Sequence, residues 1–155
     1  MATRRSLRLE DYHGLADLRY HVRNFLRVRE LACRKIGIAP QHYQLLLQLK
    51  GLEGRAPATV SALAERLQLR HHSTVGLIDR LAARGFIQRR PDVRDRRQVI
   101  VELRPRGTAV LKRLALYSFL ELRTEGPALV NTLGRLLRGP RRRKVRRARR
   151  ARRRR

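Results

Sequence analysis

The residues best suited to chemistry lie on one face of a short predicted helix, and they suit hydrogen bonding to nucleic-acid bases. An inward stripe is predicted at helical spacing by Thr74, Leu77, Ile78 and Leu81. The opposite face must point outward, and it is small or polar, with Gly76 at mid-helix and Asp79 one turn later. Such a face fits the major groove of DNA, where donors meet base edges and a valine can meet a thymine methyl. The predicted base contacts are His71, His72, Ser73, Val75 and Gly76, and the predicted phosphate contacts are Arg70 and Arg80.

A basic hairpin predicted directly after this helix supplies more donors. Gly85 is predicted to end the helix, and alternating residues predict strands over 86–91 and 99–103. The turn between them holds three arginines and two aspartates, of which Asp92 is predicted to form the turn. A narrow minor groove concentrates negative potential, so one of three arginines is predicted to enter it: Arg94, Arg96 or Arg97. The alternative for the helix face is a solvated face of an interaction domain, and the alternative for the hairpin tip is a solvated charged hairpin that contacts nothing.

The elements that position these groups form a familiar order. A first helix is predicted over residues 61–67, with Ser61 as its N-cap and Val60 ahead of it as a hydrophobic staple. A break at residues 68–70 separates it from the second helix. Short helix, tight turn, second helix and basic hairpin together predict a winged helix-turn-helix.

This stretch resembles the MarR family of bacterial transcriptional regulators. The resemblance rests on L-A-E-R-L at 63–67, on S-T-V-G-L-I-D-R-L-A-A-R-G-F-I-Q-R at 73–89, and on the wing motif D-x-R-D-x-R. All four fixed positions of that motif are met, by Asp92, Arg94, Asp95 and Arg97. The resemblance extends over residues 12–137 and implies that Asp95 braces the wing by pairing with a neighbouring arginine. Arg104 stands where members commonly have threonine, so the next helix must start at its proline without a hydroxyl cap.

The resemblance also implies partners. The corresponding proteins form dimers through their N- and C-terminal helices, bind double-stranded DNA, and often bind a small aromatic ligand in the crevice between the dimer and DNA-binding regions. A ligand there would change the spacing of the two recognition helices. Tyr20, His21 and Tyr43 are the candidate ligand-lining residues.

The rest of the chain divides into three parts. Residues 1–9 are predicted to be a flexible basic arm, residues 10–139 a winged-helix domain, and residues 140–155 a disordered Arg-rich tail. Within the domain, a winged-helix core over 40–104 is flanked by dimerisation helices over 10–36 and 105–138, the latter as a helix to about 125 and another over 128–137. The fold class is thus mainly α with a small β-hairpin wing. These outer helices offer more apolar surface than a monomer needs, which favours a two-fold dimer.

The charge of the chain favours a polyanionic partner. Its formal net charge is +27, from 39 Lys and Arg against 12 Asp and Glu, and 12 of the basic residues follow Gly139. This balance leaves open a rival function, that of a sequence-indifferent architectural or RNA-associated basic protein. Arginine outnumbers lysine by 35 to 4, and genomic base composition alone can cause such a skew. Charge placement is therefore better evidence than charge count.

Other classes of function find little support. The sequence has no nucleophile elbow, phosphate loop or paired-carboxylate motif, so no enzyme, cofactor or catalytic residue is predicted. Its histidines are dispersed, and no metal site is predicted. The one cysteine, Cys33, is either a packed small hydrophobe or, between basic neighbours, a redox-sensing thiol. No membrane span and no signal peptide are predicted, which gives a cytoplasmic, nucleoid-associated protein.

Overall fold

The chain follows the predicted order of elements. Within residues 7–93 and 95–138, which the structure describes, the computed structural model contains six helices and one antiparallel hairpin. The elements are α1 (Leu9–Lys35), α2 (Pro40–Leu52), α3 (Val60–Leu67), α4 (His71–Ala83), β1 (Ile87–Pro91), β2 (Val99–Leu103), α5 (Pro105–Thr124) and α6 (Gly126–Arg138). The mainly helical fold with a β-hairpin wing is confirmed. The flexible basic N-terminal segment predicted over residues 1–9 lies mostly outside the described residues, and the Arg-rich tail predicted over residues 140–155 lies wholly outside them.

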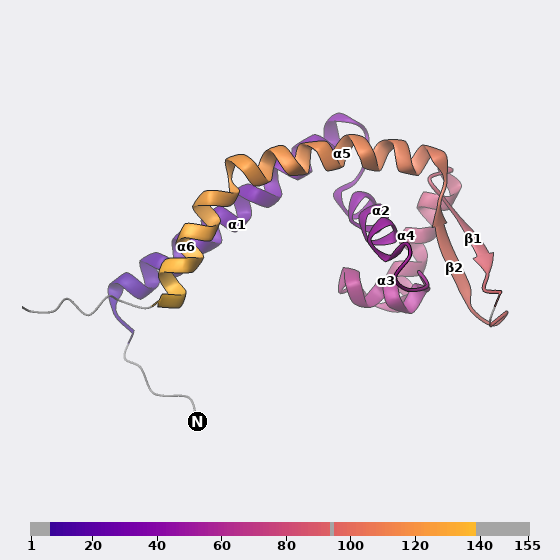
Figure 1. Ribbon diagram of the computed structural model, residues 1–155, viewed down its shortest axis with the longest axis horizontal. Coiled ribbons are helices and arrows are strands. Elements are labelled where there is room, and N and C mark those ends of the chain that lie inside the picture. The colour runs from indigo at the N-terminus through magenta and orange to yellow at the C-terminus, as the bar shows by residue number, and fades with distance from the viewer. Residues whose placement is uncertain (1–6, 94, 139–155) are drawn as a thin grey trace, which may run out of the picture.

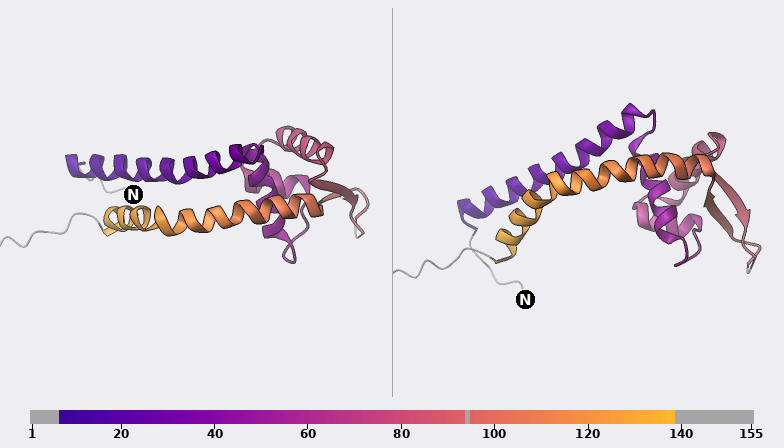
Figure 2. Two further views of the ribbon diagram at one scale, coloured as in Figure 1. Left: turned by 90° about the horizontal axis from the view of Figure 1, so that it is seen from above. Right: turned by 45° about the horizontal axis from the view of Figure 1, so that its top comes forward.

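Three helices form a long arm. The α1 helix runs antiparallel to α5 and α6, and the three extend away from the other elements (Figures 1 and 2). The α1 and α6 helices approach closely at Gly14, where an added Cβ would lie 2.6 Å from Cδ2 of Leu136. The α6 helix starts at Gly126, two residues earlier than predicted, because Pro127 falls in its first turn, where its missing N–H has no intrahelical partner. None of these described helices has the length and apolar character needed to cross a bilayer.

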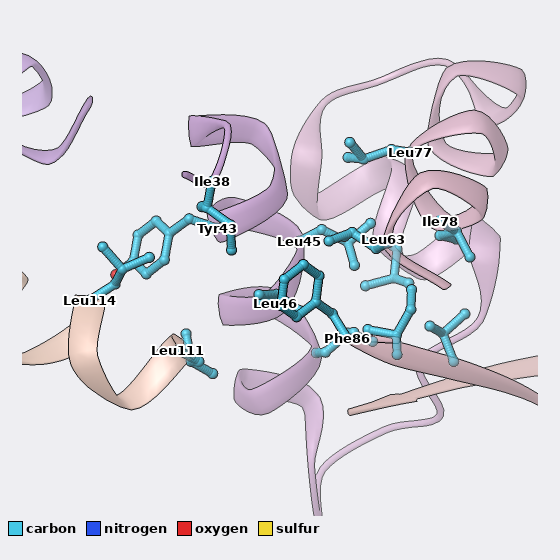
Figure 3. Packing of buried hydrophobic residues seen from close by; sticks show 14 of the residues in the cluster. Ile38, Tyr43, Leu45, Leu46, Leu63, Leu77, Ile78, Phe86, Leu111 and Leu114 are labelled. Carbon is cyan, nitrogen blue, oxygen red and sulfur yellow. The ribbon is translucent and has the colours of Figure 1, made fainter. Parts of the chain in front are cut away.

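The remaining elements form the winged-helix lobe, which consists of α2, α3, α4 and the hairpin, closed by the N-terminal half of α5 (Figure 1). Its core joins side chains from all four helices (Figure 3). The side chains that are less than 2% exposed include Tyr43, Leu45, Leu46, Leu63, Leu77, Ile78, Leu81, Ile87, Val101 and Leu114. Burying each such aliphatic side chain contributes about 1.5–3 kcal/mol. The lobe is therefore held mainly by apolar packing.

Two further predicted boundaries were wrong by one or two residues, one in α3 and one in β1. The N-cap of α3 is Thr59, whose Oγ1 accepts a hydrogen bond from the Ala62 amide at 3.2 Å, so Ser61 lies inside the helix. Thr59 takes this position because it also pairs with Ile100 of β2 in an isolated bridge, which holds its backbone extended. Strand β1 begins at Ile87 instead of the preceding residue. As expected, α5 begins at its proline with no side-chain cap.

The hairpin is anchored at its base against α5. Its register pairs Ile87 with Leu103 at the base and Pro91 with Val99 near the tip. Gly107 of α5 packs directly on the strand entry, where an added Cβ would lie 2.1 Å from the Phe86 carbonyl oxygen. Only glycine fits at this distance. The start of α5 thereby fixes where the wing leaves the lobe.

Candidate nucleic-acid interface

The α4 helix presents the predicted outward face. Its inward side chains are buried, with Thr74, Ile78 and Leu81 each 0% exposed and Leu77 1% exposed. The Thr74 hydroxyl also donates a hydrogen bond to the Arg70 carbonyl oxygen at 3.1 Å, so this polar group is satisfied inside the core. On the other side lie the five predicted base contacts. His71, His72 and Ser73 are exposed, whereas Val75 and Gly76 are half-buried. The two predicted phosphate contacts, Arg70 and Arg80, are exposed.

The turn after α4 sets the direction in which the wing leaves the lobe. Gly85 has φ +71°, its amide donates to the Ala82 carbonyl at 2.9 Å, and the Phe86 amide donates to the Leu81 carbonyl at 3.0 Å. This pair of bonds is a Schellman motif, which needs a left-handed residue at Gly85. The guanidinium groups of Arg84 and Arg106 each lie 4.9 Å from the centre of the Phe86 ring. The predicted helix end is therefore confirmed, and the wing starts at a turn held by these hydrogen bonds and ring contacts.

The tip of the wing is held by Asp95. Its Oδ1 accepts a hydrogen bond from the Arg97 backbone amide at 3.0 Å, and its Oδ2 accepts one from the Gln98 side chain at 3.1 Å. The contacts described for this carboxylate are thus with a backbone amide and a glutamine, where the family resemblance implied an arginine side chain. The Asp92 amide donates to the Gln98 carbonyl at 2.9 Å across the turn.

Two of the three arginines at the wing tip have described positions. Arg96 and Arg97 are exposed at the end of the hairpin. Arg94, the third arginine predicted to approach the minor groove, lies outside the described residues. The exposed positions of the first two leave their side chains accessible to a ligand beyond the wing.

An ion pair that the sequence analysis missed joins α4 to the wing. Nη1 of Arg89 lies 2.5 Å from Oδ1 of Asp79, which links β1 to the outward face of α4. On the opposite face of the hairpin, Nη2 of Arg90 lies 2.5 Å from Oε1 of Glu102. Strand alternation could have indicated that Arg89 points toward the lobe, because Arg89 shares a strand face with Ile87, whose side chain is buried against the lobe.

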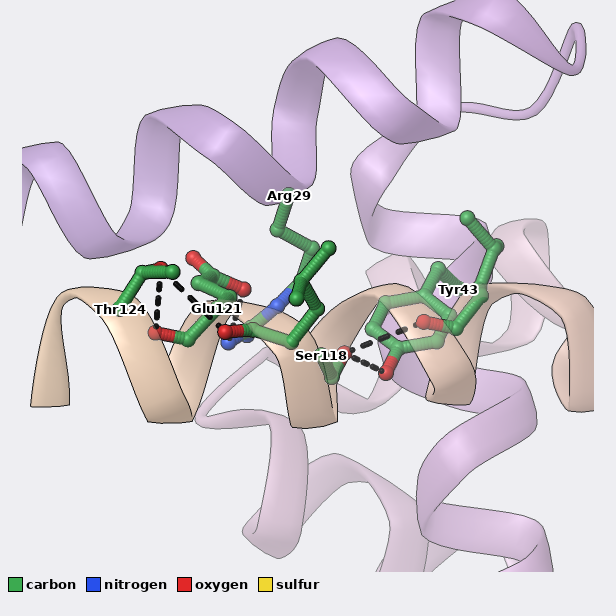
Figure 4. Close-up of polar contacts among 7 residues, drawn as sticks. Arg29, Tyr43, Ser118, Glu121 and Thr124 are labelled. Carbon is green, nitrogen blue, oxygen red and sulfur yellow. Dashed lines mark hydrogen bonds and ion pairs between the residues drawn. The ribbon is translucent and has the colours of Figure 1, made fainter.

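A second polar cluster lies where the arm meets the lobe (Figure 4). Nη2 of Arg29 on α1 lies 3.7 Å from Oε2 of Glu121 on α5. The Arg29 guanidinium also lies 5.0 Å from the ring centre of Phe25 and 5.9 Å from that of Tyr43. The Tyr43 hydroxyl shares a 2.8 Å hydrogen bond with Ser118. Burial raises the pKa of Glu121, and Arg29 opposes that shift.

The three candidate ligand-lining residues are not gathered into one cluster. Tyr43 is 1% exposed in the core of the lobe, while Tyr20 is 62% exposed on α1. His21 lies beside Tyr20, with ring centres 5.5 Å apart. Arg29, which touches Tyr43, is nine residues beyond Tyr20 on the same helix, or about 13 Å along its axis.

Cys33 is buried and His42 is half-buried, and burial shifts the pKa of each side chain. Cys33 is 0% exposed, and burial raises the pKa of its thiol, which disfavours the reactive thiolate. Burial, with help from Arg84 and Arg80, lowers the pKa of His42, which favours its neutral form. Within residues 7–93 and 95–138, no three His, Cys, Asp or Glu side chains gather as a metal site would require.

Comparisons with known proteins agree with this geometry. Residues 36–98 match the MarR family. The fold is similar to that of AbsC, a MarR family transcriptional regulator from Streptomyces coelicolor, with a TM-score of 0.69, 18% identity, and 88% of this chain and 99% of AbsC covered. It is also similar to a MarR mutant from E. coli complexed with operator DNA, with a TM-score of 0.63, 22% identity, and 77% and 87% of the two chains covered.

A third solved structure is that of BpsR from Bordetella bronchiseptica, whose DNA binding is regulated by 6-hydroxynicotinic acid. The chain is similar to it with a TM-score of 0.59 and 18% identity, and 79% of this chain and 91% of BpsR are covered. No curated protein sequence matches the chain. At these identities, the structural likeness establishes the fold.

Proposed function

Because the chain carries the winged helix-turn-helix of the MarR family, we propose that it is a sequence-specific DNA-binding regulator of transcription that acts as a homodimer. The observation that carries the proposal is the outward face of α4, which is small, polar and accessible and lies beside a basic wing. His71, His72 and Ser73 are exposed on that face, and Arg96 and Arg97 are exposed at the wing tip.

In this proposal, α4 enters the major groove and the wing reaches the adjacent minor groove. His71, His72, Ser73, Val75 and Gly76 meet base edges, because an α-helix fits the width of the major groove. Arg70 and Arg80 flank that face and meet phosphates, which set register and orientation. The solved complex of the E. coli MarR mutant with operator DNA supports this choice of ligand.

The proposed dimer rests on the apolar surface of the arm. Large apolar side chains remain exposed along all three arm helices, far more than on the lobe. The most exposed ones on α5 and α6 are Leu116, Phe119, Leu120, Val130 and Leu137, each at least 60% exposed. Extensive exposed apolar surface can mark a protein interface. A two-fold dimer through the arm would present two α4 helices to an inverted repeat with half-sites about 10 bp apart.

We extend the proposal to a small aromatic ligand that changes the spacing of the two recognition helices. Its support is the likeness to BpsR, whose DNA binding is regulated by 6-hydroxynicotinic acid. The separation of Tyr20 from Tyr43 argues against a single pocket built from the residues predicted from sequence. A regulator of this kind acts where the chromosome is, in the nucleoid of the cytoplasm.

One experiment separates this function from that of a sequence-indifferent basic protein. In vitro selection of bound duplexes from a random pool is expected to enrich an inverted repeat. The affinity for that repeat should exceed the affinity for unrelated DNA by a factor of about 10³ to 10⁷. Enrichment of no sequence, or equal affinity for RNA and for any duplex, would favour the rival. Light scattering at micromolar concentration tests the dimer, and a monomer would contradict it.

A further inference from the structure

We infer that Asp79 determines specificity by holding Arg89, so that the arginine's charge is withheld from the phosphates of non-cognate DNA. This inference rests on the proposed DNA-binding function and adds a residue that acts through another. Asp79 is a positioning residue in this role, since its contact is with Arg89 of the wing strand.

The position of Asp79 on α4 makes a carboxylate there unexpected. It lies seven residues after His72 and three after Gly76, so all three share the outward side of the helix. Asp79 is the only acidic residue of α4, and all of that helix is described. Its side chain is 54% exposed. A free carboxylate on the face that approaches a phosphate backbone would repel it.

The pairing with Arg89 removes that repulsion. The Arg89 guanidinium sits 2.5 Å from the Asp79 carboxylate, with its side chain 37% exposed, so the two opposite charges cancel at the surface. The other arginine of β1, Arg90, is paired in the same way with Glu102. Both arginines of the strand are therefore neutralised by carboxylates.

The described arginines at the tip of the wing are not neutralised in this way. In the part of the chain that the structure describes, Arg96 and Arg97 have no carboxylate within ion-pair distance of their side chains. The wing thus separates its charge into a neutralised strand beside α4 and a cationic tip. Sequence-independent affinity grows with each cation that meets a phosphate. Withholding Arg89 keeps that affinity low and leaves discrimination to the outward face of α4.

Loss of the pair should change binding more than folding. Exposed ion pairs add little stability, and neither side chain belongs to the core. The Asp79→Asn variant keeps the size of the side chain and removes its charge, which frees Arg89. A second function of Asp79 would be direct readout, because a carboxylate can accept a hydrogen bond from the N4 amino group of cytosine. The two functions differ in what substitution does to non-specific binding.

The experiment measures the affinities of the full-length protein for the selected repeat and for an unrelated duplex at several salt concentrations. For Asp79→Asn, we expect tighter binding to the unrelated duplex and a smaller specificity ratio. The slope of log K against log salt should steepen by about 0.9 for each freed arginine that meets a phosphate. Adding Arg89→Gln should return the slope to that of the wild type, and Asp79→Glu should retain wild-type specificity.

A matched control separates this effect from a change in net charge. Glu30→Gln removes one exposed carboxylate from α1, outside the lobe, and should leave the specificity ratio unchanged. An unchanged slope for Asp79→Asn on the unrelated duplex would overturn the inference. A changed preference at one base pair with no change in slope would instead assign Asp79 to direct readout. If the wild type showed no sequence preference, the proposed function would fail, while the slopes on the unrelated duplex would still test the ion pair.

Discussion

Arg29 of α1 and Glu121 of α5 form an ion pair across the junction of the arm and the lobe, with 3.7 Å between Nη2 and Oε2. The Glu121 side chain is 1% exposed, and that of Arg29 is 15% exposed. Within the described residues, Oε1 of Glu121 and Nε of Arg29 have no hydrogen-bond partner. A buried pair that is only partly satisfied stabilises a fold weakly, because the desolvation of both charges offsets their attraction.

Glu121 should give the stability of the protein a specific pH dependence. Burial raises its pKa above the ordinary value of 4.5, and Arg29 opposes this shift without cancelling it. An acid with a raised native pKa contributes stability that is present below pH 4.5 and lost as the pH rises through the native pKa. Urea unfolding at fixed protein concentration should show this loss in the wild type and a smaller loss in Glu121→Gln. Parallel pH profiles for the two proteins would contradict the assignment.

Gly107 should tolerate no side chain. Alanine there would place Cβ 2.1 Å from the Phe86 carbonyl oxygen, so either α5 or the hairpin base must shift. We expect Gly107→Ala to lower the free energy of unfolding by about 1–3 kcal/mol. Gly51→Ala is the matched control, because its added Cβ would meet nothing closer than 4.0 Å. That change on an exposed helical position should raise stability by up to about 1 kcal/mol, and equal effects at both glycines would refute the close-packing argument.

Asp95 and Arg97 should act on DNA binding as one unit. Alanine at position 95 removes the acceptors that hold the Arg97 amide and the Gln98 side chain, so the tip loosens. Alanine at position 97 keeps the amide but removes the predicted minor-groove contact. Each change should weaken operator binding, and the double variant should lose less than the sum. A double-mutant cycle on the selected repeat measures the coupling, and strictly additive losses would count against the brace.

The basic tail should contribute affinity without specificity. Residues 139–155 lie outside the described residues, and their composition supplies 12 cations and no acid. Deleting Arg141–Arg155 should leave the sequence preference intact and reduce the salt slope by roughly three to six, since each lost phosphate contact removes about 0.9. Binding isotherms at several salt concentrations, on one duplex, check this expectation. Equal slopes would mean that the tail does not contact DNA, and a lost preference would give it a larger function.

Local patterns were sufficient to predict most of the elements and the two faces of α4. The bounds of α2 and α4, the glycine that ends α4 and the second strand all follow from short-range periodicity and from punctuation by glycine and proline. The buried stripe of α4 was also predicted, because a helix that buries four residues at that spacing must expose the others. These features depend on residues within a few positions of one another.

Contacts between elements were decided by tertiary structure alone. The cap of α3 moved to Thr59 because a bridge to Ile100, 41 residues away, holds that backbone extended. In the same way, the ion pair between Asp79 and Arg89 forms because the angle at which the hairpin leaves α4 brings the two side chains together. The periodicity of α2 predicted that Tyr43 packs in the core, but its hydrogen bond to Ser118 of α5, 75 residues away, depends on how α2 and α5 pack together. Helical and strand periods specify which side of an element is buried, but the packing angles and long-range pairings that choose its neighbours arise only when all the elements share one core.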